Sequence, residues 1–365
     1  MRILIDIGHP AHVHLYRNFI RVLSGRGVEF TITARDKDVT LSLLRAYDIP
    51  FIPVGALRKG KTKVFREWLK RDIEIYKIAR GFKPTYLMGL LNPAIAHSAF
   101  LLKRPAIIFN DSEPEAIRFP IADWITTPFV NTIIVPDSIR HSYGAKEVRV
   151  SSYKELAYLH PNQFKPDFKI LSDAGISKGE EFVLIRFVAW RAYHDIKEGG
   201  FSMEQKLKLI EELSQYATVF ISSESPLPPE LEKYRIPIPP HHIHHFLYYA
   251  KLLVCDSQTM TTEAGVLGTP AIRSNSFVGS RDMGNFIELE KKYGLIYNIK
   301  KPEDAIKKAV ELVKQPGLKK RWAKKREMLL KDKIDLTSFM IWFIENYPDS
   351  VEEFKQNPEI QYRFR

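Results

Sequence analysis

The sequence predicts an α/β fold made of two doubly wound domains. Short apolar runs that suit buried parallel strands alternate with amphipathic stretches of helical period along almost the whole chain. The alternation pauses at residues 160–167, a stretch with two prolines and few apolar side chains that is typical of a linker. A chain of 365 residues is long enough for a hydrophobic core on each side of that linker.

The first half opens with a strand–helix–strand unit. Residues 2–7 form an apolar strand, residues 13–23 the helix and residues 28–33 the second strand, which is the usual beginning of a doubly wound sheet. No G-x-G-x-x-G pattern follows the first strand, which argues against dinucleotide binding. Further helices are expected at residues 39–47, 63–80 and 93–102, and further strands at residues 50–54, 85–88, 106–109 and 132–135.

The second half repeats this alternation beyond the linker. We expect strands at residues 182–187, 218–222 and 252–255, and helices at residues 203–213, 244–250, 303–314, 319–331 and 338–346. Ligand sites in such sheets form beyond the carboxyl ends of the strands. The residues that follow each strand are therefore the first candidates for chemistry.

Residues 256–272 hold the most informative pattern in the chain. The apolar strand at 252–255 ends at Asp256, and either Ser257 or Thr259 can cap the helix that follows. Gly268 stands where a helix commonly ends, and Pro270 prevents the helix from continuing before the next strand begins. The segment is thus predicted to fold as strand, tight turn, helix, turn and strand.

The start of this helix is suited to an anion. A helix N-terminus offers unpaired N–H groups and the positive end of the helix dipole. Ser257, Gln258 and Thr259 can contact phosphate oxygens, while Glu263, about one turn further on, suits a sugar diol better than a phosphate. Phosphate at the helix start and ribose on a carboxylate is the layout of a nucleotide-diphosphate site. The alternative is an ordinary capped helix with a solvated Glu263.

Four segments carry a family resemblance: IDIGHPAHVH at residues 5–14, TARD at residues 33–36, NDSE at residues 110–113 and the block at residues 259–270. Together they resemble the DUF354 family of archaeal and bacterial proteins, and the resemblance covers most of the chain. The last block is also similar to the donor-binding strand–turn–helix of GT-B glycosyltransferases and of UDP-N-acetylglucosamine 2-epimerases.

The resemblance implies a GT-B-like fold, in which two Rossmann-like doubly wound domains have a cleft between them. Residues 1–163 would form the N-terminal acceptor-side domain and residues 164–338 the C-terminal nucleotide-sugar donor domain, with residues 339–365 as a helical tail that crosses back to the N-terminal domain. It also implies that the turn before the helix holds the diphosphate and that Glu263 holds the ribose. GT-B enzymes generally need no catalytic metal, so neither a metal nor a cofactor besides the nucleotide-sugar co-substrate is expected.

Three histidines, His9, His12 and His14, crowd the loop after the first strand and the start of its helix. Histidine is the side chain whose ordinary pKa lies nearest neutrality, so one of the three could deprotonate an acceptor hydroxyl. By resemblance to GT-B transferases that act on lipid-linked substrates, His12 matches the proposed base, with His9 and His14 on the acceptor side. A packing or capping role is the alternative for each.

A second group of candidates follows the strand at residues 106–109. Asn110, Asp111 and Glu113 suit acid–base work or recognition of sugar hydroxyls, with Asp111 and Glu113 as the catalytic candidates and Asn110 on the acceptor side. The 2-epimerases have an acidic motif in a comparable place, so these residues fit either class of enzyme. A solvated capping loop is the other interpretation.

A third group follows the first strand of the second half. Arg186 at the strand end suits bidentate pairing with phosphate, and by resemblance both Arg186 and His194 are candidates for nucleotide-sugar binding. A basic surface loop is the alternative. The four histidines at residues 241–245 invite a zinc hypothesis, but no cysteine or acid accompanies them, so no metal site is predicted.

Composition limits the class of protein. The single cysteine, Cys255, excludes an internal disulfide framework, and no apolar run approaches the roughly 18 residues of a membrane-spanning helix. No signal-peptide pattern precedes the first strand, so a cytoplasmic protein is expected. The net charge of +12 calls for an anionic partner: a nucleotide-sugar, an acidic membrane face or nucleic acid. Nucleic acid is the least supported, because no nucleic-acid-binding motif accompanies the charge.

The main hypothesis is a metal-independent GT-B glycosyltransferase that uses a nucleotide-sugar, with UDP as the favoured nucleotide. The basic loop at residues 58–63 suggests a lipid-linked or otherwise acidic acceptor, and therefore a peripheral location at the inner membrane face. The first alternative is a UDP-sugar 2-epimerase, either hydrolysing or non-hydrolysing. The second is a nucleotide-sugar- or RNA-binding protein without catalysis.

Overall fold

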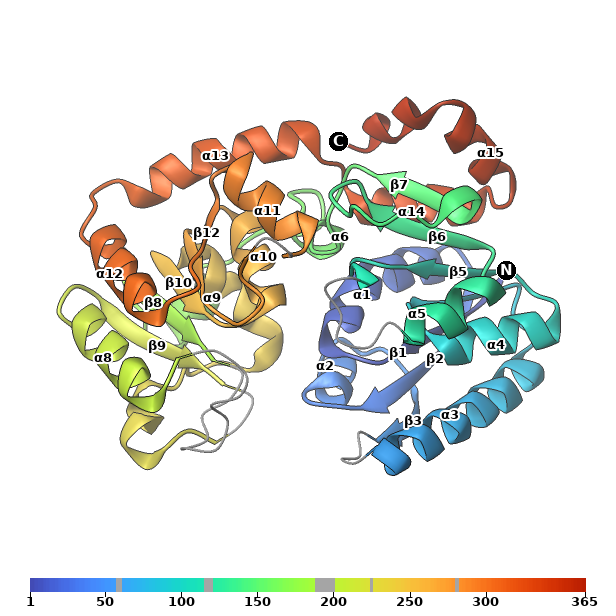
Figure 1. The fold of residues 1–365 in the computed structure, drawn as a ribbon, viewed down its shortest axis with the longest axis horizontal. Coiled ribbons are helices and arrows are strands. Elements are labelled where there is room, and N and C mark those ends of the chain that lie inside the picture. The colour runs from blue at the N-terminus through green and yellow to red at the C-terminus, as the bar shows by residue number, and fades with distance from the viewer. Residues whose placement is uncertain (57–60, 115–120, 188–200, 224–225, 280–281) are drawn as a thin grey trace. The chain divides into compact units, whose positions relative to one another are not determined.

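The computed structural model describes residues 1–56, 61–114, 121–187, 201–223, 226–279 and 282–365 (Figure 1). The chain divides into two compact units. The first unit is Met1–Gln163 together with Lys333–Arg365, and the second unit is Phe164–Asp332. The chain passes from one unit to the other within the stretch 160–167, and it returns to the first unit at Lys333, before residue 339 where the tail was predicted to begin.

The first unit is built on a seven-stranded parallel sheet with the order β3-β2-β1-β4-β5-β6-β7. The strands are β1 (Arg2–Ile7), β2 (Glu29–Asp36), β3 (Ile52–Ala56), β4 (Tyr86–Leu90), β5 (Ala106–Phe109), β6 (Thr132–Pro136) and β7 (Glu147–Val150). The order of the strands reverses between β1 and β4. Such a switch point is where doubly wound sheets bind ligands.

Helices cover both faces of this sheet (Figure 1). Four of them pack against one another: α1 (Pro10–Gly25), α2 (Thr40–Ala46), α6 (Leu156–Leu159) and α14 (Leu336–Glu345). The other group is α3 (Lys61–Phe82), α4 (Pro93–Leu102) and α5 (Ile121–Thr126), followed by the 3₁₀ turn η2 (Thr127–Phe129). Because the crossovers are right-handed and the chain reverses direction at the switch point, these two groups lie on opposite faces.

The C-terminal tail is part of the first unit. It consists of α14, α15 (Asp349–Gln356) and the 3₁₀ helix η7 (Pro358–Phe364). The ring of Phe339 in α14 packs edge-on against Phe354 and Phe364, with centroids 5.6 and 5.9 Å away. The side chain of Gln361 accepts a hydrogen bond of 2.7 Å from the backbone N–H of Ser151, just beyond β7. The tail therefore completes the first unit rather than extending from it.

The second unit is built on a five-stranded parallel sheet with the order β12-β11-β10-β8-β9. Its strands are β8 (Phe182–Arg186), β9 (Thr218–Ser222), β10 (Leu252–Cys255), β11 (Ala271–Arg273) and β12 (Ile296–Asn298). Its helices are α7 (Lys169–Asp173), α8 (Met203–Ser214), α9 (Ile243–Tyr249), α10 (Gln258–Leu267), α11 (Gly284–Lys291), α12 (Pro302–Val313) and α13 (Leu318–Asp332). The switch point of this sheet lies between β8 and β10.

The predicted strands and helices are all present, with ends that move by a few residues. The pattern missed the strands β7 and β12 and the helices α5, α6, α7, α11 and α15. The strands β7 and β12 lie at sheet edges, where one side is solvated and the run of buried residues is short, so no continuous apolar stretch marks them. In the described part of the chain, no helix is both long enough and apolar enough to cross a bilayer.

Helix α10 is fixed at both ends by the residues that the sequence singled out. Ser257 is its N-cap and accepts a hydrogen bond of 3.4 Å from the N–H of Met260, while Gly268 ends it with a φ of 72°. Helix α13 carries many lysines and arginines, and one of them contacts α10. Arg326 donates a hydrogen bond of 2.7 Å to the carbonyl of Val266 in the last turn of α10. A cation at that end complements the helix dipole.

Replacing Gly268 with alanine is expected to destabilise the second unit more than the same change at Gly317. Both glycines have a positive φ, which costs a residue with a side chain about 1–3 kcal/mol. Only at Gly268 would the added methyl also collide with another side chain, since Arg326 Cδ lies 2.9 Å from its position, whereas nothing lies within 4 Å at Gly317. Urea unfolding of G268A and G317A measures the difference, and equal midpoints would contradict this role of Arg326.

Candidate functional site

The switch point of the second unit brings together two of the predicted phosphate-binding elements. Arg186 at the end of β8 is in register with Cys255 at the end of β10, and α10 begins just after β10. The Arg186 guanidinium donates a hydrogen bond of 3.3 Å to Ser222 Oγ at the end of the neighbouring strand β9. Arg186 and the first turn of α10 therefore lie at the same edge of the sheet.

The first turn of α10 has the properties of an anion site. It contains no acidic residue, and the backbone N–H groups of Gln258 and Thr259 have no acceptor within the helix. Ser257, Gln258 and Thr259 are partly exposed, whereas Met260 to Leu267 are buried. The positive end of the helix dipole adds to the attraction for a phosphate group.

Glu263 has a buried histidine partner that the sequence did not reveal. Its side chain is 5% exposed, and its Oε1 lies 2.9 Å from Nε2 of His244 in α9. His244 is one of the four histidines that suggested zinc. Among the described residues, no group of three or more His, Cys, Asp or Glu side chains is placed to hold a metal ion. The contact with His244 orients the Glu263 carboxylate and rules out the solvated position that the alternative assumed.

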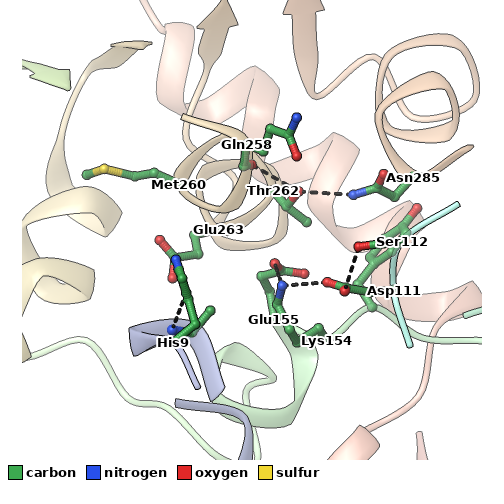
Figure 2. Close-up of polar contacts among 12 residues, drawn as sticks. His9, Asp111, Ser112, Lys154, Glu155, Gln258, Met260, Thr262, Glu263 and Asn285 are labelled. Carbon is green, nitrogen blue, oxygen red and sulfur yellow. Dashed lines mark hydrogen bonds and ion pairs between the residues drawn. The ribbon is translucent and has the colours of Figure 1, made fainter. Parts of the chain in front are cut away.

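A second helix N-terminus contributes to this edge of the sheet. The side-chain amide of Asn285, in the first turn of α11, donates a hydrogen bond of 3.3 Å to Thr262 Oγ1, as Figure 2 shows. The loop that leads into α11 is held by a buried ion pair between Arg273 and Asp282, and the Arg273 guanidinium lies 3.6 Å from the centre of the Phe286 ring. No sequence pattern marks Asn285, Arg273, Asp282 or Phe286.

Two predicted features fall outside the described residues. They are His194 and residues 58–60 of the basic loop at 58–63. Both remain predictions.

The two histidines that follow β1 use the same ring nitrogen in the same way. His9 is the N-cap of α1, and its Nδ1 accepts a hydrogen bond of 3.2 Å from the N–H of Ala11. Nδ1 of His12 accepts one of 3.3 Å from the N–H of Gly8. In a neutral imidazole the other nitrogen then carries the proton. Each ring therefore presents an Nε2–H donor rather than a lone pair.

The surroundings of these rings keep them neutral. Burial, together with the positive charges of Lys37 and Lys154, lowers the pKa of His9 to about 3, although Asp111 acts in the opposite direction. The pKa of His12 is also lowered well below its ordinary value, mainly by burial and then by His9 and the nearby cations. A neutral ring with its proton on Nε2 is a poor general base, so the structure does not favour the base role predicted for His12.

Asp111 is the predicted acid that lies among these groups. Its Oδ2 is 2.5 Å from Nζ of Lys154, and that ammonium is 3.6 Å from Glu155 Oε1 (Figure 2). Lys154 follows the end of β7 and is 7% exposed. Neither Lys37 nor Lys154 was predicted, because a single lysine after a strand has no distinguishing pattern. Their position after β2 and β7 was the only available signal.

The other predicted groups of the first unit have structural partners. Glu113 is 1% exposed and binds Arg140 through the backbone N–H at 2.7 Å and through Nη2 at 2.5 Å. Asn110 shapes the loop by accepting a hydrogen bond of 3.1 Å from the N–H of Ser112. The His14 ring stacks on Tyr158, with centroids 5.2 Å apart. These contacts favour a structural role for Glu113, Asn110 and His14 over the catalytic or acceptor role predicted from sequence.

A buried ion pair supports the strand ends of the first unit. Asp6 in β1 has no exposed surface and receives hydrogen bonds from Thr33 Oγ1 at 2.6 Å, from Arg71 and from Asn92. Arg71 also donates to the carbonyl of Val54 at 3.0 Å. This network ties β1 to β2, α3 and the loop after β4, and so fixes the segment that carries His9.

The sequence profile of a family described as "Protein of unknown function (DUF354)" matches residues 1–340. This chain belongs to the DUF354 family. A relative in Methanocaldococcus jannaschii, itself an uncharacterized protein, is 21% identical over 282 residues, which are 73% of this chain and 80% of the relative.

Solved structures similar to this DUF354 protein include members of two classes of enzyme. The UDP-GlcNAc 2-epimerase of Neisseria meningitidis bound to UDP-GlcNAc is 15% identical, with a TM-score of 0.61 over 95% of this chain and 100% of that one. The spinosyn rhamnosyltransferase SpnG complexed with thymidine diphosphate is 14% identical, with a TM-score of 0.61 over 95% and 100% of the two chains. At this identity the likeness establishes the fold, which is GT-B-like with two Rossmann-like domains.

The environment of His9 predicts a specific acid sensitivity in this DUF354 protein. Between pH 6.5, the ordinary value, and about pH 3, residue 9 takes up a proton in the unfolded chain but not in the folded one. The free energy of unfolding therefore falls as the pH is lowered through that window. In H9N, asparagine keeps the N-cap hydrogen bond but cannot titrate, so the loss of stability should be smaller.

Urea midpoints at about pH 7 and about pH 4.5 measure this effect. H245N serves as the control for removing an imidazole, since His245 lies in the second unit. An equal loss of stability on acidification in H9N and the unaltered protein would refute the neutral His9 that the structure indicates.

Proposed function

We propose that this protein is a metal-independent glycosyltransferase that takes its sugar from a nucleotide-sugar, with UDP as the nucleotide. The observation that carries the proposal is the N-terminus of α10, which is free of acidic residues and follows β10 at the switch point of a parallel sheet. Similar proteins of both enzyme classes have a nucleotide or nucleotide-sugar bound, UDP-GlcNAc in one and thymidine diphosphate in another. This agrees with a nucleotide-sugar as the donor.

The diphosphate in this proposal lies on the N–H groups of Gln258 and Thr259. The hydroxyl of Ser257 donates to a phosphate oxygen while it still accepts from Met260. Arg186 at the end of β8 adds a fixed positive charge. As the bond between the sugar and the diphosphate breaks, negative charge builds up on the leaving group, and the helix dipole and the guanidinium stabilise it without a metal ion.

The ribose in this proposal is bound by Glu263. A carboxylate accepts hydrogen bonds from two neighbouring hydroxyls, and the contact of 2.9 Å with His244 keeps it in one orientation. Its position about one turn beyond the helix start matches the separation of a ribose from its diphosphate.

In this proposal, residues of the first unit bind the acceptor and deprotonate its hydroxyl. Asp111 replaces His12 as the general base, because a carboxylate can accept a proton whereas Nδ1 of both His9 and His12 already accepts a backbone N–H. Asp111 removes the proton of an acceptor hydroxyl, the oxygen bonds to the anomeric carbon, and the diphosphate leaves. His9 and His12 act as neutral Nε2–H donors to the acceptor. Lys37 and Lys154 favour an acceptor that carries a carboxylate or phosphate group.

An epimerase is the second candidate, since UDP-GlcNAc 2-epimerases share the fold. Asp111 next to Lys154 would equally suit proton abstraction from a sugar carbon. Incubation with a UDP-sugar alone separates the two reactions. An epimer, or rapid release of UDP without an acceptor, supports the epimerase, whereas an unchanged sugar that is consumed only when an acceptor is added supports the transferase.

Replacing Thr259 with glutamate is expected to separate folding from binding. A carboxylate in the first turn of α10 interacts favourably with the helix dipole, so T259E should unfold at least as late as the unaltered protein in the absence of ligand. The same charge repels a diphosphate, so the affinity for UDP should fall at least about tenfold, which is 1.4 kcal/mol. T259Q is the control of similar shape without the charge.

Thermal unfolding with and without UDP measures both properties. The proposal predicts that UDP raises the melting temperature of the unaltered protein and of T259Q but not of T259E. Full stabilisation of T259E by UDP would rule out the N-terminus of α10 as the diphosphate site.

Substitutions of Asp111 and of Glu113 are expected to have different effects, the first on the reaction rate and the second on stability. In the presence of an acceptor, D111N should slow the release of UDP from a UDP-sugar by about 10²–10⁴-fold without changing the affinity for UDP, because it removes the base. E113Q should instead lower the melting temperature, because it weakens the contact of the buried Glu113 with the half-exposed Arg140, and should keep its turnover per folded molecule. Initial rates and melting curves of the two variants test this, and the opposite assignment of effects would favour Glu113 as the catalytic acid.

A further inference from the structure

Five large apolar side chains are exposed on three successive helices of the first unit that cover the same face of its sheet. They come from α3, α4 and α5, and their exposed fractions are 50% for Leu69, 54% for Ile73, 61% for Phe100, 62% for Leu101 and 75% for Trp124. We call this set the apolar face. Soluble proteins rarely leave several large apolar side chains exposed on adjacent helices without a binding partner.

Contacts between the three helices hold the apolar face together. His97 in α4 has Nδ1 2.7 Å from Asp72 Oδ2 in α3 and Nε2 2.9 Å from the carbonyl of Ile125 in α5. Ile73 follows Asp72 in the sequence, and Trp124 precedes Ile125. Phe100 and Leu101 lie one turn beyond His97, on the same side of α4. Figure 1 shows α3, α4 and α5 side by side in the first unit.

The apolar face is surrounded by positive charge. Exposed cations stand on α3 and directly after α4: Lys70, Lys77, Arg80, Lys103 and Arg104. Of the acids on these elements, Asp72 contacts His97, Glu74 lies 3.6 Å from Lys70, and Glu67 is buried against Arg35. The described surface of these helices is therefore basic, in keeping with the net charge of +12.

A pocket lies beside the apolar face. It has a volume of about 560 Å³, and its lining includes Phe100 and Phe129 together with Lys103, Arg104 and Lys146. The Phe100 and Phe129 rings meet edge to face, with centroids 5.1 Å apart. Lys146 donates to the carbonyls of Thr127 and Pro128 at 2.8 and 2.9 Å, so its ammonium is held in place. Three cations beside an aromatic wall, with Lys146 held in place, suit a phosphate group attached to an apolar chain.

We propose that the apolar face docks on the surface of an anionic lipid bilayer, with a lipid headgroup phosphate in the pocket between Lys103, Arg104 and Lys146. Tryptophan and phenylalanine favour the boundary between headgroups and acyl chains, and lysine and arginine around them are drawn to acidic lipids. A second copy of this chain is a less suitable occupant, because two basic faces repel each other. The inference does not depend on the proposed sugar chemistry.

Vesicle co-sedimentation of the full chain, without any nucleotide-sugar, tests the docking. Vesicles of phosphatidylcholine with about 30% phosphatidylglycerol should bind the protein, and vesicles of phosphatidylcholine alone should bind it far less. Raising the salt from about 0.1 M to about 0.5 M should weaken binding, because it screens exposed charges. Equal binding to both vesicle types, or no binding to either, overturns the proposal.

Variants locate the contact on the surface. Replacing both Phe100 and Trp124 with serine, and separately both Lys103 and Arg104 with glutamate, should each lower the partition coefficient by at least tenfold, since each surface cation contributes roughly fivefold. M328S is the matched control, because Met328 is 50% exposed on α13 of the second unit. Melting curves confirm that each variant is folded.

Two results would assign the face to something other than a bilayer. If the variants bind anionic vesicles as well as the unaltered protein does, the bilayer contact lies elsewhere. If sedimentation velocity finds a dimer that the F100S and W124S pair dissociates, a second copy occupies the face. Either result overturns the proposal.

Discussion

Parallel pairing of the strands is the constraint on which the candidate site of each unit depends. When all strands of a sheet run the same way, their carboxyl ends share one edge, and the helices that follow direct their N–H groups toward that edge. In the second unit this places Arg186 after β8 and the first turn of α10 after β10 at one switch point. The opposite end of α10 is closed by Gly268 and by the hydrogen bond from Arg326. The helix thus has a cation at its negative end and no acidic residue in the first turn at its positive N-terminus.

In the first unit the same constraint brings two lysines and the acid Asp111 to the histidine rings at the strand ends. Burial lowers the pKa of His9, and Lys37 after β2 and Lys154 after β7 act in the same direction. Under the proposed function, these cations attract the negative group of the acceptor. Asp111 remains the base candidate because its partner is Lys154. Glu113, only two residues away, is neutralised by Arg140 and buried.

The sequence predicted what depends on local pattern. The strand at 252–255, the cap by Ser257, the end of α10 at Gly268 and the passage between units within 160–167 all follow from hydrophobic period, capping and breaker residues. The two shortest edge strands, β7 and β12, were not predicted, because a run of three or four residues with one solvated side gives too weak a hydrophobic pattern.

The pairings that decide chemical roles could not be predicted in this way. The contacts Glu263–His244, Asp111–Lys154 and Glu113–Arg140 join residues 19, 43 and 27 positions apart, and only the folded sheet brings them together. The ring nitrogen that His12 uses is likewise set by the backbone turn at Gly8, which no residue pattern reveals. This is why the sequence favoured His12 as the base, whereas we propose Asp111 after seeing these contacts.

The most direct measurement is a crystal structure of the protein with UDP bound. The account predicts the diphosphate within hydrogen-bonding distance of the N–H groups of Gln258 and Thr259, the Arg186 guanidinium close to its charge and the ribose hydroxyls on Glu263. A diphosphate bound at any other place in the second unit, or UDP bound only through the first unit, would contradict it.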